Sequence, residues 1–163
     1  MAEQRVRVLF VCLGNICRSP TAHGVFEALV QAEGLSHRIE VDSAATSDWH
    51  IGNPPDPRSI AMARERGVDL STQRARQVSA EDFHRFDYIL AMDGQNLRDL
   101  QSLQPAGSRA RVTLFLEFDP QSPEQEVPDP YYGGKEGFAK VVELVERASR
   151  ALLDHINQWN LKP

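Results

Sequence analysis

The stretch that decides the fold runs from residue 6 to residue 20 and reads Val6-Arg7-Val8-Leu9-Phe10-Val11-Cys12-Leu13-Gly14-Asn15-Ile16-Cys17-Arg18-Ser19-Pro20. Its first six residues are mostly β-branched or apolar, which predicts a buried strand over 6–11. Gly14 and Asn15 break this pattern and indicate a turn. Ser19-Pro20 then predicts the start of a helix, because proline is favoured at the first helical position. The stretch thus predicts a strand, a loop and a helix in direct succession.

The residues that follow extend this unit into an alternating chain of strands and helices. Apolar residues recur with helical spacing up to Gly34, and residues 38–44 alternate as a second strand does. A rigid loop is expected at 53–57, a short helix from Ile60 to near Gly67, and further strands at 86–92 and 111–116. A long closing helix is expected to bury the face formed by Phe138, Val141, Val145, Ala148, Leu152, Ile156 and Trp159.

This order of elements predicts a single α/β domain spanning residues 1–163. A strand–helix–strand unit favours a parallel crossover, and alternation of the two element types places helices on both faces of the sheet. We therefore expect a three-layer domain with a four-stranded parallel sheet and a phosphate-binding loop after the first strand. A length of 163 residues suits one compact core.

Composition narrows the class of protein. Charged residues make up 25% and hydrophobic residues 41% of the chain, which is ordinary globular usage. A formal net charge of -5 without a basic run argues against a nucleic-acid partner. Two cysteines do not make a disulfide framework, so a reducing cytoplasm is expected. The apolar runs are too short to span a membrane and the N-terminus has no signal-peptide pattern, so we expect no membrane attachment.

The loop that begins at Cys12 has the features of an oxyanion site. Arg18 lies six positions after Cys12, a spacing that is weak evidence on its own because arginine is frequent in this chain. The loop joins a buried strand to a helix, which is where α/β sheets bind ligands. Gly14 permits positive φ, so successive backbone N–H groups can turn inward beside the positive end of the helix. The loop residues Leu13, Gly14, Asn15, Ile16 and Cys17 are therefore candidates for phosphate binding.

The same features give Cys12 the environment of a nucleophile. Inward N–H groups and a nearby cation favour the thiolate, which is the reactive form of cysteine. Arg18 can hold two phosphoryl oxygens, Ser19 can donate a hydrogen bond to the sulfur, and Asn15 can pin the loop backbone. The alternative is that Cys12 is a small buried hydrophobe at the end of a strand. That alternative treats Gly14 and the three polar residues as coincidences, and we favour the catalytic interpretation.

Residues 11–20 resemble the signature of the low-molecular-weight protein tyrosine phosphatases, and Asp129-Pro130-Tyr131-Tyr132-Gly133 resembles the general-acid loop of that family. The resemblance continues in the family's order through Ser43-Ala44, Trp49, Asp56-Pro57-Arg58-Ser59, Ala75-Arg76-Gln77 and Asp93, and it is greatest for bacterial members. It implies that Cys12 attacks phosphorus to give a phosphocysteine, which Arg18 and the loop amides stabilise. It further implies that Asp129 protonates the leaving phenolate and then activates water, with no metal or other cofactor.

The resemblance also implies partners and regulation. Trp49 and Tyr131 would flank the substrate ring, with Tyr132 next to Tyr131, and both tyrosines would be phosphorylation sites. The expected substrates are tyrosine-phosphorylated proteins, among them an autophosphorylating bacterial tyrosine kinase. Cys12 and Cys17 would form a reversible disulfide under peroxide. From the residues alone, a turn role for Asp129 and a packing role for Trp49 stay open, and His50 has no assigned role.

Departures from the family pattern and rival classes complete the sequence prediction. Gln73 stands where many members have a histidine that supports the loop with Asn15, and Ala45 stands where glycine is common. Arsenate reductases relay electrons through additional cysteines, which this chain lacks after Cys17. Protein arginine phosphatases resemble this chain but carry threonine at the position of Ile16. A phosphotyrosine-binding module without turnover would not need the catalytic residues.

Overall fold

Four parallel strands form one central sheet in a computed structural model that describes residues 5–131 and 133–161. They are β1 (Val6–Cys12), β2 (Ile39–Ala45), β3 (Tyr88–Ala91) and β4 (Arg111–Leu114), in the spatial order β2-β1-β3-β4. Val8 pairs with Val41 on one side and with Tyr88 on the other, so β1 is a central strand. The predicted four-stranded parallel sheet is confirmed.

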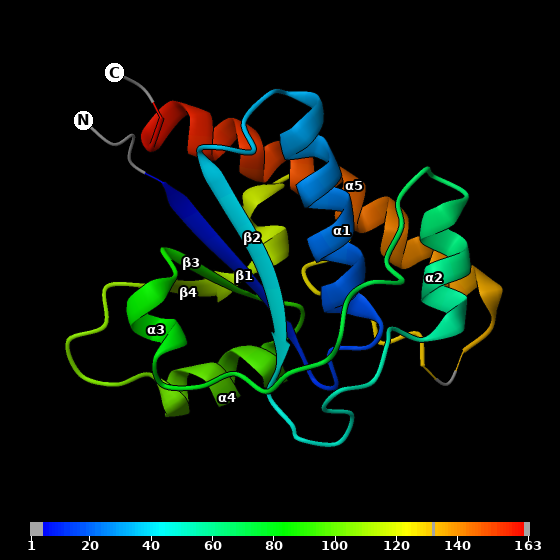
Figure 1. Cartoon of the computed structure of the whole chain (residues 1–163), viewed down its shortest axis with the longest axis horizontal. Helices are drawn as coiled ribbons and strands as arrows, with labels where there is room; N and C mark the ends of the chain where they lie inside the picture. Colours follow the sequence, from blue (N-terminus) through cyan, green and yellow to red (C-terminus); the bar gives the residue numbers. More distant parts are fainter. Residues whose placement is uncertain (1–4, 132, 162–163) are drawn as a thin grey trace.

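Helices cover both faces of this sheet (Figure 1). The first face packs against α1 (Arg18–Ala32) and α5 (Lys135–Trp159), and the second against α3 (Asp82–Arg85) and α4 (Gly94–Leu103). A further helix, α2 (Pro57–Arg64), packs beside α1 and α5. The predicted three layers are confirmed, and the described residues form a single α/β domain.

The side chains of β1 alternate between two hydrophobic cores. Val8 and Phe10 belong to the core under α1 and α5, whereas Leu9 and Val11 belong to the core over α3 and α4. Phe10 meets the rings of Phe26 and Phe115 edge-on, with centroid distances of 5.7 and 4.9 Å. A strand buried on both faces explains why its sequence is a continuous apolar run rather than an alternating one.

Two predicted features of the chain's second half are wrong. The strand expected over 111–116 ends at Leu114, and Phe115 begins a short 3₁₀ helix, η1 (Phe115–Phe118). Phe115 and Leu116 both enter the core under α5, and two successive residues of a strand would point to opposite faces. Trp159, expected on the buried face of α5, is 69% exposed because it is the last residue of that helix, beside His155 and beyond the core contact of Ile156.

Local hydrogen bonds account for two smaller differences. Helix α2 begins at Pro57, three residues before the expected start, because the Asp56 side chain accepts a hydrogen bond from Arg58 N at 2.8 Å and proline fits the first turn. The short helix α3 was not expected from the sequence. Its first residue, Asp82, is buried and accepts bonds from Ser79 N and the Arg76 guanidinium.

Candidate active site

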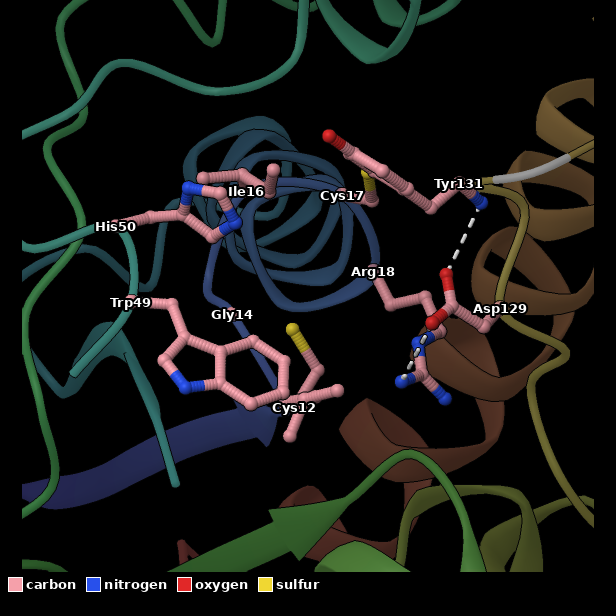
Figure 2. A pocket seen from close by; sticks show the side chains of 10 residues that line it. Cys12, Gly14, Ile16, Cys17, Arg18, Trp49, His50, Asp129 and Tyr131 are labelled. Carbon is pink, nitrogen blue, oxygen red and sulfur yellow. Dashed lines mark hydrogen bonds and ion pairs between the residues drawn. The ribbon is translucent and has the colours of Figure 1, made fainter. Parts of the chain in front are cut away.

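A cavity of about 160 Å³ opens at the carboxyl edge of the sheet, where the loop from β1 to α1 lies. The β1 strand is followed by a helix on one face and its neighbour β3 by a helix on the other, which is the arrangement that creates a crevice in α/β sheets. The cavity is lined by Cys12, Leu13, Gly14, Ile16, Cys17, Arg18, Trp49, His50, Asp129 and Tyr131 (Figure 2). The three predicted catalytic residues are therefore brought together.

The sulfur of Cys12 is surrounded by hydrogen-bond donors. Asn15 N and Ser19 N donate to Cys12 Sγ at 3.3 and 3.4 Å, and Ser19 Oγ lies 3.1 Å from the same sulfur. Asn15 has a φ of 58°, a left-handed conformation that asparagine tolerates better than most residues and that turns the loop inward. Two backbone donors are thus aimed at a sulfur that is buried within the loop.

Arg18 is held by the junction between β3 and α4. Its side chain is 3% exposed, and Nη1 donates to Asp93 Oδ2 at 2.6 Å and to the carbonyl of Val127 at 3.1 Å. The other oxygen of Asp93 caps α4 by accepting a bond from Asn96 N at 2.8 Å. Burial opposes the charge of the guanidinium, but the negative charges of Cys12 and Asp93 outweigh it and raise the pKa of Arg18. The site therefore contains a permanent, fixed cation.

Asp129 reaches the cavity from the loop before α5. Its Oδ1 accepts a hydrogen bond from Tyr131 N at 3.0 Å, and its Oδ2 lies 3.8 Å from Arg18 Nη2. The side chain is 42% exposed, so it stands at the mouth rather than at the base of the cavity (Figure 2). The turn role and the cavity role that the sequence left open are compatible, because one carboxylate oxygen serves the turn and the other faces the arginine.

Aromatic side chains stand on opposite sides of the opening (Figure 2). Trp49 is 67% exposed and Tyr131 37% exposed, so neither is held inside the core. His50, which has no role assigned from the sequence, also lines the cavity and packs on Gly14, where an added Cβ would lie 2.9 Å from His50 Cδ2. Only its position after Trp49 could have pointed to it. Tyr132, expected beside Tyr131, lies outside the described residues.

The side chains of Asn15 and Ser19, which the sequence predicts to pin the loop backbone and to bond the sulfur, lie beneath the cysteine loop. Asn15 Nδ2 donates to Ser19 Oγ at 2.7 Å and to Ser43 Oγ at 3.0 Å, and Asn15 Oδ1 accepts a bond from Arg76 N at 3.1 Å. These side chains do not line the cavity, because they are occupied by hydrogen bonds to one another and to β2. Their backbone N–H groups still point at the sulfur of Cys12.

Cys17 is the second thiol of the site. It lines the cavity but is only 5% exposed. Burial, followed by the nearby negative charge of Asp56, raises the pKa of Cys17 to about 12, so this sulfur is a neutral thiol at physiological pH. The two cysteines are thus electrostatically different: Cys12 receives backbone donors, whereas Cys17 is buried beside negative groups.

The start of α2 joins the cysteine loop to the loop that carries Asp129. Asp56 N donates to the carbonyl of Ile16 at 2.7 Å, and the Asp56 carboxylate accepts bonds from Arg58 Nε and Nη2 at 3.0 and 2.9 Å. Hydrogen bonding to Arg58 lowers the pKa of Asp56. The Arg58 guanidinium lies over the ring of Tyr131 at 5.5 Å and over that of Phe138 at 4.6 Å. This link was not predicted, because it depends on contacts between distant segments.

The described residues contain neither a cluster suited to a metal ion nor a helix suited to a membrane. Within residues 5–131 and 133–161, no three or more histidine, cysteine, aspartate or glutamate side chains are grouped to hold a metal ion. In the same part of the chain, no helix combines the length and the apolar character needed to cross a membrane.

Comparison with known proteins places this fold and this cavity in one family. Residues 7–161 match the family model described as low molecular weight phosphotyrosine protein phosphatase. The human protein of that name is 48% identical over 157 residues, which are 94% of this chain and 98% of the human one. The crystal structure of YfkJ from Bacillus subtilis has a TM-score of 0.91 and 38% identity, and the match covers 98% of this chain and 99% of that one.

The chain therefore belongs to the low-molecular-weight phosphotyrosine protein phosphatase family, and it is a protein-tyrosine phosphatase. A third comparison shows that the fold also carries another specificity. The Drosophila arginine phosphatase has a TM-score of 0.84 and 33% identity, covering 91% of this chain and 96% of that chain. A shared fold therefore does not by itself determine which phosphorylated side chain is hydrolysed.

We expect the variant Arg58→Met to lower kcat/KM by about three- to tenfold. The substitution removes both the cation over the ring of Tyr131 and the ion pair with Asp56. The decrease should be larger for aryl phosphates with poor leaving groups, since the stack supports Tyr131 and hence the adjacent Asp129. The measurement is kcat/KM for a series of substituted phenyl phosphates. Arg66→Met is the matched control, because Arg66 pairs with Glu146 outside the cavity. An equal loss for all leaving groups would contradict this role.

Proposed function

We propose that this chain hydrolyses phosphotyrosine in proteins by a two-step mechanism in which Cys12 is the nucleophile and Asp129 the acid and base. The observation that carries the proposal is the convergence of three groups on one small cavity: a sulfur ringed by donors, a buried cation and an exposed carboxylate. Those are the groups that transfer of a phosphoryl group to sulfur requires.

In the first step the Cys12 thiolate attacks phosphorus opposite the phenolic oxygen. The sulfur–phosphorus bond forms as the phosphorus–oxygen bond breaks, and protonated Asp129 gives its proton to the leaving oxygen. Arg18 and the backbone amides of Leu13, Gly14, Ile16 and Cys17 bind the equatorial oxygens, while those of Asn15 and Ser19 donate to the sulfur. The fixed cation supports this step because Asp93 and Val127 already hold it in place, so little reorganisation is needed.

In the second step the Asp129 carboxylate accepts a proton from water, whose oxygen attacks the phosphocysteine. The new phosphorus–oxygen bond forms, the sulfur leaves as a thiolate, and inorganic phosphate is released. The Ser19 hydroxyl supports the departing sulfur from 3.1 Å. The positive charge of Arg18 and the loop amides neutralises the transferring group in both steps, and the proposed reaction uses no metal or other cofactor.

Substrate choice rests on the opening of the cavity. Trp49 and Tyr131 are exposed on its two sides and offer flat faces between which an aryl ring fits. The proposed substrates are tyrosine-phosphorylated proteins. The resemblance to the family suggests an autophosphorylating bacterial tyrosine kinase as one of them. The site also suits phosphate and similar oxyanions as inhibitors. The buried free thiols Cys12 and Cys17 support a cytoplasmic, reducing location.

Hydrolysis of para-nitrophenyl phosphate tests the mechanism directly. Cys12→Ser should lose at least about a thousandfold in kcat, because the nucleophile is gone. Asp129→Ala should lose about a hundredfold or more, because proton transfer is lost. The measurement is kcat and KM from pH 5 to 8 in the presence of chelator.

Asp154→Ala, which removes an exposed carboxylate from α5, is the control and should keep the wild-type rate. An inactive wild type, or a Cys12→Ser variant that keeps its rate, would contradict the mechanism and leave the loop as an oxyanion-binding site.

Phosphoarginine is the candidate substrate that competes with phosphotyrosine. The side chain of Ile16 favours phosphotyrosine. Ile16 is an apolar residue on the cavity wall, which suits an aryl ring better than a guanidinium. We expect the wild type to release phosphate from a phosphotyrosine peptide at least about tenfold faster than from a matched phosphoarginine peptide. Ile16→Thr should reduce that ratio by adding a hydroxyl to the wall. Faster release from the phosphoarginine peptide by the wild type would reverse the assignment of substrate.

Reversible oxidation is the proposed means of protecting Cys12. Peroxide converts the Cys12 thiolate to a sulfenic acid, and the Cys17 thiolate then displaces hydroxide to form a disulfide that dithiothreitol reduces. Because the pKa of Cys17 is raised to about 12, its thiolate fraction rises about tenfold per pH unit near neutrality.

We therefore expect disulfide closure to quicken about tenfold per unit between pH 6 and 8, as measured by mass spectrometry after a peroxide pulse. After excess peroxide, dithiothreitol should restore the activity of the wild type but not that of Cys17→Ala, in which further peroxide oxidises the unprotected sulfenic acid of Cys12 to a sulfinic acid. Inactivation of the wild type that dithiothreitol fails to reverse would exclude this protection.

A further inference from the structure

A hydrogen-bonded chain leads from the sulfur of Cys12 to the surface of α1. Cys12 Sγ lies 3.1 Å from Ser19 Oγ, and Asn15 Nδ2 donates to Ser19 Oγ and to Ser43 Oγ. Ser43 Oγ in turn lies 3.1 Å from Nδ1 of His23, a residue in the second turn of α1. The proposed mechanism uses Ser19 directly, but it assigns nothing to the imidazole at the far end of this chain.

The donors and acceptors in this chain fix its direction. Asn15 Oδ1 accepts a bond from Arg76 N, so the amide of Asn15 must face the two serines with its N–H groups. Each serine oxygen then accepts a bond from Asn15 and keeps its own hydrogen to donate. The Ser19 hydrogen can point at the sulfur of Cys12, 3.1 Å away, which is nearer than its other acceptor, the carbonyl of Ala44 at 3.5 Å. The Ser43 hydrogen can then point at His23 Nδ1, which accepts it when the imidazole carries its own hydrogen on Nε2.

The second nitrogen of His23 faces a carboxylate. His23 Nε2 lies 3.6 Å from Oε2 of Glu27, one helical turn further along α1. Hydrogen bonding to His23 lowers the pKa of Glu27, so this carboxylate stays charged. Because the Glu27 carboxylate is a hydrogen-bond acceptor, it favours the tautomer of His23 that carries its hydrogen on Nε2 and leaves Nδ1 as an acceptor for Ser43. The His23 side chain is 14% exposed, which limits competition from water.

Gln73 is not the side chain that bonds Ser43 beneath the cysteine loop. Its Nε2 donates to the carbonyl of Pro20 at 3.1 Å, and its Oε1 is buried without a hydrogen-bond partner. Position 73, where many members of the family have histidine, is therefore turned toward the backbone at the start of α1. The imidazole next to the buried network comes from α1 itself.

We propose that His23, oriented by Glu27, is a positioning residue for the nucleophile, acting through Ser43 and Asn15 on the Ser19 hydroxyl that contacts Cys12. This inference rests on the proposed function and deepens it. Loss of His23 leaves the Ser43 hydroxyl without its acceptor, so Ser43 can rotate and compete for the bonds that hold Asn15. The loop donors around Cys12 are then less well aligned, and chemistry slows more than binding does.

Steady-state kinetics with para-nitrophenyl phosphate tests the inference. We expect His23→Ala to lower kcat by about fivefold, the equivalent of one hydrogen bond, with KM changed less than about twofold. His23→Asn, whose Oδ1 can accept from Ser43, should stay within about twofold of the wild type. His84→Ala, which removes an exposed histidine from α3, is the matched control and should leave kcat unchanged.

Two further measurements separate positioning from a general loss of structure. Adding His23→Ala to Ser43→Ala should give no slower enzyme than Ser43→Ala alone, because residues that act through one another are not additive. Alkylation of Cys12 by iodoacetamide at pH 6 should slow in His23→Ala and recover in His23→Asn. The alkylation assay does not depend on turnover, so it tests His23 even if the wild type hydrolyses no aryl phosphate.

An unchanged kcat in His23→Ala, losses that multiply in the double variant, or a His23→Asn variant as slow as His23→Ala would each overturn this role. A wild type without phosphatase activity but with alkylation rates that follow this pattern would refute the proposed function and retain the positioning role.

Discussion

The buried charge of Arg18 is the constraint on which the rest of the structure depends. A guanidinium that is 3% exposed must be compensated inside the protein, and Asp93 provides this from the N-cap position of α4. The same contact joins the first residue of α1, which covers one face of the sheet, to the N-cap of α4, which covers the other face. Asp93 pairs with only one end of the guanidinium, because its short bond is made to Nη1. At the other end, Asp129 lies 3.8 Å from Nη2. The fold thus holds a cation that still has directions in which to bind an anion.

Local sequence patterns were sufficient to predict most of the fold and the central residues of the site. Residues 6–20 contain a buried strand, a turn and a helix start within one short segment, so the position of Cys12 and Arg18 follows from neighbours in sequence. Contacts between distant segments were not recoverable in this way. The stacking of Arg58 on Tyr131, the packing of His50 on Gly14 and the histidine beside Ser43 each depend on how loops meet after folding. Periodicity also failed at chain ends, where Trp159 continues the helical pattern after the core has ended.

Polar groups beneath the cysteine loop form a network in which each member limits the others. Asn15 uses both amide hydrogens and its carbonyl, which leaves it one orientation. Such a network is stable when it is satisfied throughout, and it transmits the loss of any partner because the remaining groups are buried. The left-handed backbone of Asn15 adds a second demand at the same position, so one residue serves both the shape and the bonding of the loop.

The order of the elements has a consequence for how the enzyme comes into being during synthesis. Helix α1 and the strands β1 and β2 lie within the first 45 residues, whereas Asp129 and helix α5 belong to the last part of the chain. A ribosome therefore releases the segment that holds the nucleophile long before the segment that holds the acid. Helix α5 also covers the core beneath α1, so the early segment lacks its hydrophobic cover until the chain is nearly complete. Catalytic competence is in this sense a late event, and the appearance of turnover would report that the carboxyl-terminal helix has docked.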